Sequence, residues 1–196
     1  YAVDYFNAAL EKNAYKLKVA AQYGLALAYM RAEENEKAKE IVINQLLSQD
    51  PSNLFYLDAA TDIYIALGEP LKAVELLQPH VSLNPRNQVL ALNQANALIS
   101  ASQYEQAIDL LRDFLLVNKD YQIAYQLMTE AYQKAKQFSQ MHQSKAEVYA
   151  LYGAYTRAVD ELQYAYNFAG EDHLEKQRIR ARIKQFRDQE ERLERL

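Results

Sequence analysis

The chain has 196 residues, of which 50% are apolar or aromatic and 24% are charged, with only four Gly and four Pro. This low content of Gly and Pro favours long helices with short connections, and we therefore expect an all-α fold. The formal charge of −4 argues against nucleic-acid binding, because such binding depends on clustered Lys and Arg. The absence of cysteine excludes disulfides and thiolate zinc sites, and no apolar run reaches the roughly 18–20 residues that span a membrane.

The first two predicted segments are a single helix and a helix pair. Residues 1–13 form an amphipathic pattern with Ala2, Phe6 and Ala9 on one face, and no capping residue precedes it. Residues 17–51 predict two helices closed by Asp50-Pro51. We expect a longer connection around residues 13–16, because Ala2 and its counterpart Ala38 are 36 positions apart and later intervals are close to 34.

Residues 54–85 show the repeating unit most clearly. Large, small and aromatic residues share the packing face of a first helix, a glycine follows, and small and large residues mark a second helix: Leu57, Ala60, Tyr64, Gly68, Ala73 and Leu77. This order is the tetratricopeptide-repeat (TPR) pattern. Pro70 fits the first turn of the second helix. Pro79 predicts a kink or an early end of that helix, because proline cannot donate the main-chain hydrogen bond.

The same pattern recurs in residues 88–118, 122–152 and 139–169. The last two repeats overlap, because residues 139–153 serve as the second helix of one unit and the first helix of the next. On this frame residues 1–13 match the second helix of a truncated repeat. We therefore expect the chain to be a fragment of a longer protein, with this first helix frayed or packed on a partner chain.

Residues 171–196 are predicted to form a charged capping helix with a narrow apolar stripe, as the end of a solenoid requires. Four cations gather on one side of it, where they are either solvated or contact an acidic partner: Lys176, Arg180, Lys184 and Arg187. The sequence thus predicts one domain over residues 1–196, a right-handed TPR solenoid of stacked antiparallel helix pairs ending in this cap.

No pattern in the sequence indicates catalysis. His80, His142 and His173 lack metal-binding helical spacing, and there is no H-E-x-x-H, Ser-His-Asp order or glycine-rich phosphate loop. We expect no enzyme activity and no cofactor in this chain.

The free stripe of each first helix is the candidate binding surface, since stacked repeats place these stripes on a concave face. Its apolar, amide and carboxylate side chains suit an extended peptide that is basic or neutral. The candidate groove residues are Tyr23, Leu27, Phe55, Asp58, Asp62, Asn93, Asn96, Gln126 and Glu130.

The stretches YGLALAY, LDAATDIYIALGEPLKAVELLQ, ALNQANALI, KAEVYALYGAYTRAVDELQYA and ARIKQF resemble the C-terminal TPR region of periplasmic β-barrel assembly-enhancing zinc metalloproteases. The resemblance implies an exported, periplasmic parent whose separate catalytic domain holds the zinc. It also implies docking to outer-membrane assembly components, presentation of misassembled β-barrel substrates and contact with the parent's own catalytic domain. The chain itself would be a non-catalytic interaction domain, monomeric or weakly self-associating.

Other functions remain open on the residues alone. A general TPR adaptor or scaffold could bind an extended peptide without belonging to a protease. A chaperone-tail adaptor would need a Lys/Asn/Arg carboxylate clamp, but Tyr23, Leu27, Ala59 and Val89 occupy four of the five corresponding positions, leaving only Asn93.

Overall fold

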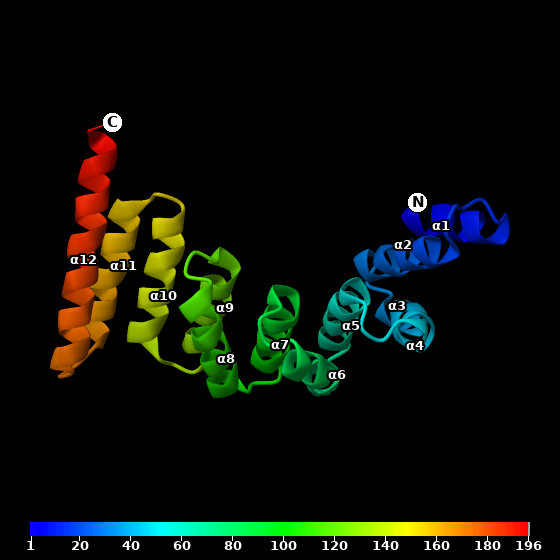
Figure 1. Cartoon of the computed structure of the whole chain (residues 1–196), viewed down its shortest axis with the longest axis horizontal. Coiled ribbons are helices and arrows are strands. Elements are labelled where there is room, and N and C mark those ends of the chain that lie inside the picture. Colours follow the sequence, from blue (N-terminus) through cyan, green and yellow to red (C-terminus); the bar gives the residue numbers. More distant parts are fainter. Residues whose placement is uncertain (196) are drawn as a thin grey trace. The chain divides into compact units, whose positions relative to one another are not determined.

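The computed structural model describes residues 1–195, apart from the side chain of Glu194, and within this range every regular element is a helix (Figure 1). The chain divides into two compact units, Tyr1–Ala101 and Ser102–Leu196. The division falls inside the predicted repeat 88–118, between its two helices. The expectation of one domain therefore stays a prediction, and each unit is described by itself.

The first unit contains the helices of the first predicted segments. They are α1 (Ala2–Glu11), α2 (Lys18–Arg31), α3 (Asn35–Ile41), the π-helix η1 (Val42–Leu46), α4 (Leu47–Gln49), α5 (Leu54–Ala66), α6 (Pro70–Leu83) and α7 (Gln88–Ser100). Their core is a continuous cluster of mostly aliphatic side chains, with Leu46, Leu57, Ile63 and Leu77 fully buried.

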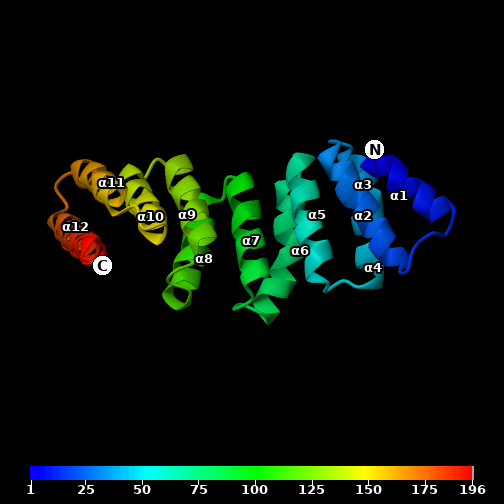
Figure 2. The same ribbon diagram turned by 90° about the horizontal axis from the view of Figure 1, so that it is seen from above.

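The second unit contains α8 (Tyr104–Val117), α9 (Gln122–Lys134), α10 (Phe138–Leu151), α11 (Tyr155–Phe168) and α12 (His173–Glu194). Figure 2 shows α10, α11 and α12 packed side by side. The core between α11 and α12 includes Leu162, Ile179 and Phe186, so part of the predicted apolar stripe of the last helix is buried, whereas Leu193 at its far end is 54% exposed.

The turns inside the helix pairs share one conformation. A single residue with positive φ follows the first helix at Glu33, Gly68, Lys136 and Gly153. In each case the next residue donates its N–H to the carbonyl of the repeat's tyrosine, at 2.9, 2.8, 2.9 and 2.9 Å for Tyr29, Tyr64, Tyr132 and Tyr149. This is the Schellman pattern of helix ends. Gly68 and Gly153 suit it without strain, whereas Glu33 and Lys136 adopt a conformation that L-residues rarely occupy.

Two local features explain the uneven repeat spacing. The connection between α1 and α2 spans residues 12–17, two residues more than the one between α4 and α5, which spans 50–53. The second helix of the next pair contains the π-helix η1, and a π-bulge accommodates one extra residue. The longer first connection matches the sequence prediction, whereas the π-helix was not anticipated.

Of the two alternatives predicted at Pro79, the early helix end is wrong, because α6 continues to Leu83, and the kink stays a prediction. Pro79 is exposed on the helix surface, so the carbonyl it leaves without a partner can be hydrated there instead of being buried.

Helix α1 packs against α2 through one close contact. Val3, Phe6 and Leu10 are partly buried against the core of the first unit. A Cβ atom placed on Gly24 of α2 would lie 2.5 Å from two carbons of the Phe6 ring. Glycine at this position therefore makes room for the ring.

We expect Gly24→Ala to destabilise the packing of α1. Overpacking costs about 1–3 kcal/mol, which exceeds the gain of up to about 1 kcal/mol from replacing glycine inside a helix. Amide hydrogen exchange in α1 should accelerate while exchange in α5 and α6 changes little. In a Phe6→Ala background the same substitution should become neutral or stabilising. Equal destabilisation in both backgrounds would rule out the steric explanation.

Candidate functional site

The predicted groove residues of the first unit lie on α2, α5 and α7. The Tyr23 hydroxyl donates to the main-chain oxygen of Phe55 at 3.1 Å, and its ring lies 5.5 Å from that of Tyr56. Tyr23 is therefore partly packed against the core and is less free than the sequence pattern indicated. Phe55 is 71% exposed and offers a bare aromatic surface.

A hydrogen bond continues this surface from α5 to α7. Asn93 donates its side-chain amide to Asp58 at 2.8 Å, and Asp62 follows one turn later on α5. Leu27 on α2 is 37% exposed, and Asn96 on α7 is half-buried. We call these seven residues the α2–α5–α7 face: Tyr23, Leu27, Phe55, Asp58, Asp62, Asn93 and Asn96.

The two carboxylates give this face an acidic character. Asp58 and Asp62 form no ion pair among the described residues. Loss of hydration raises the pKa of Asp62, although its side chain is exposed, and the charge of Asp58 raises it further. Burial raises the pKa of Tyr23, with smaller contributions from Asp58, Tyr56 and Asp62. A cation placed beside the aspartates would relieve their mutual repulsion.

The other two predicted residues, Gln126 and Glu130, are exposed on α9 of the second unit. Neither has a hydrogen bond or ion pair within the described residues. They share the side of α9 that the repeat pattern assigned to the groove, and their role in binding stays a prediction.

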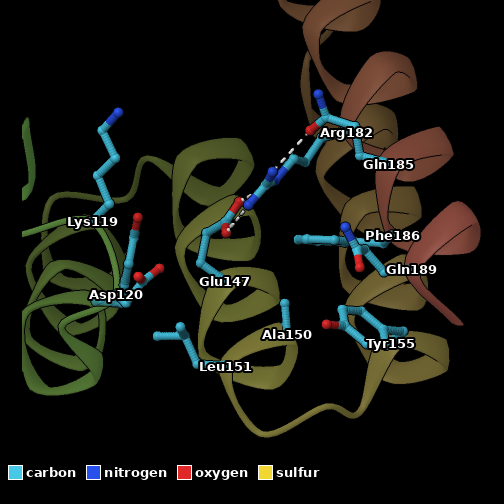
Figure 3. Close-up of a pocket in the computed structure, with 11 residues that line it drawn as sticks. Lys119, Asp120, Glu147, Ala150, Leu151, Tyr155, Arg182, Gln185, Phe186 and Gln189 are labelled. Atoms are coloured by element: carbon cyan, nitrogen blue, oxygen red, sulfur yellow. Dashed lines mark hydrogen bonds and ion pairs between the residues drawn. The ribbon is translucent and has the colours of Figure 1, made fainter. Parts of the chain in front are cut away.

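The sequence did not reveal a pocket in the second unit (Figure 3). It has a volume of about 700 Å³ and lies between the α8–α9 connection, the second half of α10 and α12. Glu147 and Arg182 form a two-point ion pair across it, with Nε to Oε1 at 2.8 Å and Nη2 to Oε2 at 2.5 Å. The hydrogen bonds to Glu147 raise the pKa of Arg182, which favours the protonated guanidinium that the ion pair requires.

The basic side of α12 is partly occupied within the chain. Lys176 lies 5.1 Å and Arg180 4.9 Å from the centre of the Tyr166 ring, and Arg180 also donates to the Tyr166 hydroxyl. Lys184 and Arg187 line a neighbouring shallow depression. Two of the four cations therefore serve helix packing, and two face outward.

Among the described residues, no group of three or more His, Cys, Asp or Glu side chains could hold a metal ion. The same range contains no helix that is both long enough and apolar enough to cross a membrane.

Comparison with solved structures defines the class of protein. A tetratricopeptide repeat protein from Parabacteroides merdae superposes with a TM-score of 0.60 at 14% identity, covering 94% of this chain and 76% of that one. MamA from Desulfovibrio magneticus superposes with a TM-score of 0.59 at 14% identity, covering 87% and 95%. The chain has the all-α TPR solenoid fold, as predicted.

Within this class, the chain is similar to the β-barrel assembly-enhancing protease of Escherichia coli K12, with 34% identity over 173 residues. The match covers 88% of this chain and 35% of the relative, so the chain spans about a third of the length of the curated relatives it matches. The resemblance found in the sequence is thereby confirmed. No protein-family model matches the chain.

The raised pKa of Asp62 has a consequence for stability. The folded protein retains this proton at a higher pH than the unfolded chain does, so the contribution of Asp62 to stability falls as the pH rises through the raised pKa. We expect Asp62→Asn to increase the melting temperature at pH 7, and the difference to vanish below the ordinary pKa of 3.8.

The increase should be smaller in an Asp58→Asn background, because the Asp58 charge contributes to the shift. Melting curves from pH 3 to pH 8 measure both effects. If Asp62→Asn melts at a lower temperature than the wild type at pH 7, the predicted direction of the stability change is wrong.

Proposed function

We propose that this chain is the protein-interaction domain of a β-barrel assembly-enhancing protease and that it binds partner polypeptides on the α2–α5–α7 face. The observation that carries the proposal is the continuity of this face. Hydrogen bonds from Tyr23 to Phe55 and from Asn93 to Asp58 join three first helices into one surface. Similarity to such proteases over 88% of the chain supports the same conclusion.

The chemistry of the face favours an extended segment that contains a basic residue. Lysine or arginine beside Asp58 and Asp62 would pair with carboxylates that have no cationic partner among the described residues. Phe55 can cover an apolar side chain of the partner or the stem of the basic one, since its ring is exposed. Asn96 can both donate to and accept from a peptide backbone.

At the level of the parent protein, we propose an exported, periplasmic protease whose separate catalytic domain holds the zinc and the general base. The repeats would contact that catalytic domain, dock the protease to outer-membrane assembly components and present misassembled β-barrel substrates to it. The relatives' name, β-barrel assembly-enhancing protease, supports this assignment of catalysis to one domain and docking to the repeats. Gln126 and Glu130 would extend the binding surface in the second unit.

Charge reversal on the face provides the test. We expect the immobilised chain to recover outer-membrane assembly components from envelope extracts, and Asp58→Lys with Asp62→Lys to reduce that recovery about tenfold, because like charges would then face a basic segment. Quantitative mass spectrometry measures the recovery. Asp160→Lys is the matched control, since Asp160 is exposed on α11 and forms no ion pair among the described residues.

Two results would contradict the proposal in different ways. If the wild-type chain recovers no assembly component, the docking role is wrong. If the double variant recovers as much as the control does, docking occurs elsewhere and the α2–α5–α7 face is not the binding surface.

A further inference from the structure

The pocket beside α12 belongs to a longer groove. A second cavity of about 260 Å³ adjoins it, and the two share Tyr125 and Glu147 as lining residues. Together they follow α10 from Gln140 to Leu151; α9 borders both cavities, and α12 borders the larger one. We call this the α10 groove. Twelve helical residues span about 18 Å at 1.5 Å per residue, which is the length of about five or six residues of extended chain.

The charges that line the α10 groove cancel. Glu147 and Arg182 neutralise each other, and the third guanidinium nitrogen, Nη1 of Arg182, donates to Gln185 at 2.8 Å. Lys119 and Asp120 stand next to each other at one edge (Figure 3). The groove therefore offers no excess charge of either sign to attract a charged ligand, in contrast to the acidic α2–α5–α7 face.

The remaining polar groups can both donate and accept hydrogen bonds. The side chains of Gln140 and Gln189 and the hydroxyls of Tyr125 and Tyr155 form no hydrogen bond within the described residues. Amides and phenols of this kind match the alternating N–H and C=O groups of a main chain. A helical ligand would satisfy its own main chain and leave these groups unused, so the lining favours an extended ligand.

Four apolar residues, which we call the floor of the α10 groove, contribute carbon surface to the two cavities: Met128, Ala150, Leu151 and Phe186. Side chains of an extended strand point alternately to opposite sides. A strand lying in the groove would therefore place every second side chain on the apolar floor and the others in water.

We propose that the α10 groove binds an extended, uncharged polypeptide segment with apolar side chains at every second position. The site uses residues of α9, α10, α11 and α12 and none of the α2–α5–α7 face. It is thus a second polypeptide site, and its test does not depend on the test of the α2–α5–α7 face.

The probe is a fluorescein-labelled, terminally blocked nonapeptide in which threonine alternates with valine, phenylalanine and tyrosine. Fluorescence anisotropy against the full chain should give saturable binding. A peptide of the same composition with its apolar residues in one block should bind at least fivefold more weakly. A version with glutamate at the threonine positions near the mouth should bind no more tightly than the threonine peptide, because the groove carries no net charge.

Variants locate the site. Leu151→Asp should weaken binding at least tenfold, because Leu151 is part of the floor and is 37% exposed. Leu174→Asp should not, since Leu174 is 67% exposed on α12 and lies outside both cavities. The double variant Gln140→Ala, Gln189→Ala removes no internal hydrogen bond and should weaken binding at least threefold. Circular dichroism confirms that each variant is folded.

The proposal is overturned if the wild-type chain does not bind the alternating peptide at 1 mM, or if the block peptide binds equally well. It is also overturned if folded Leu151→Asp and the double glutamine variant both bind like wild type. Light scattering that shows a dimer abolished by Leu151→Asp would assign the groove to a second copy of the chain instead. Asp58→Lys with Asp62→Lys should leave peptide binding unchanged, which separates this site from the acidic face.

Discussion

The close approach of the two helices in each pair is the constraint on which this structure depends. Ala38, Ala73 and Ala158 occupy the crossing position of their second helices, and all three are 0% exposed. A larger side chain at any of them would separate the two helices and open the core on both sides of the pair. Since each pair buries its apolar faces only against its neighbours, a defect at one crossing extends to the next. The stripes of the first helices outside these contacts are the surfaces for which we propose a role in binding.

The helices could be predicted from the sequence because the repeat is a local pattern. Each pair shows its own small, large and aromatic positions, so the segment around Tyr64 and Ala73 provided the frame for the rest. Gly68 and Gly153 marked two of the turns. The equivalent turns at Glu33 and Lys136 use the same backbone conformation without glycine, because the hydrogen bonds that close them are made by the main chain. The π-helix at Val42–Leu46 has no comparable local signal.

The candidate site was predicted less completely, because its contacts join residues that are far apart in the sequence. Tyr23, Phe55, Asp58 and Asn93 were identifiable as residues outside the packing positions, but the hydrogen bonds that join them cross from one pair to the next. The α10 groove depends on contacts between residues as far apart as Glu147 and Arg182. Arg182 looks like one of many cations on a solvated capping helix, and nothing near it in the sequence indicates that its partner is on α10.

The position of α12 explains why two surfaces of one chain differ in chemistry. Ser139 and Gln143 of α10 both donate to Glu175 at 2.8 Å, and Phe186 is buried against α11. These contacts hold α12 along α10. Helix α12 thus lies beside α10 and brings cations to it. Arg182 then neutralises Glu147, whereas Asp58 and Asp62 on α5 have no such neighbour among the described residues. Helix α12 therefore packs against α11 and also neutralises the carboxylate of Glu147 on α10.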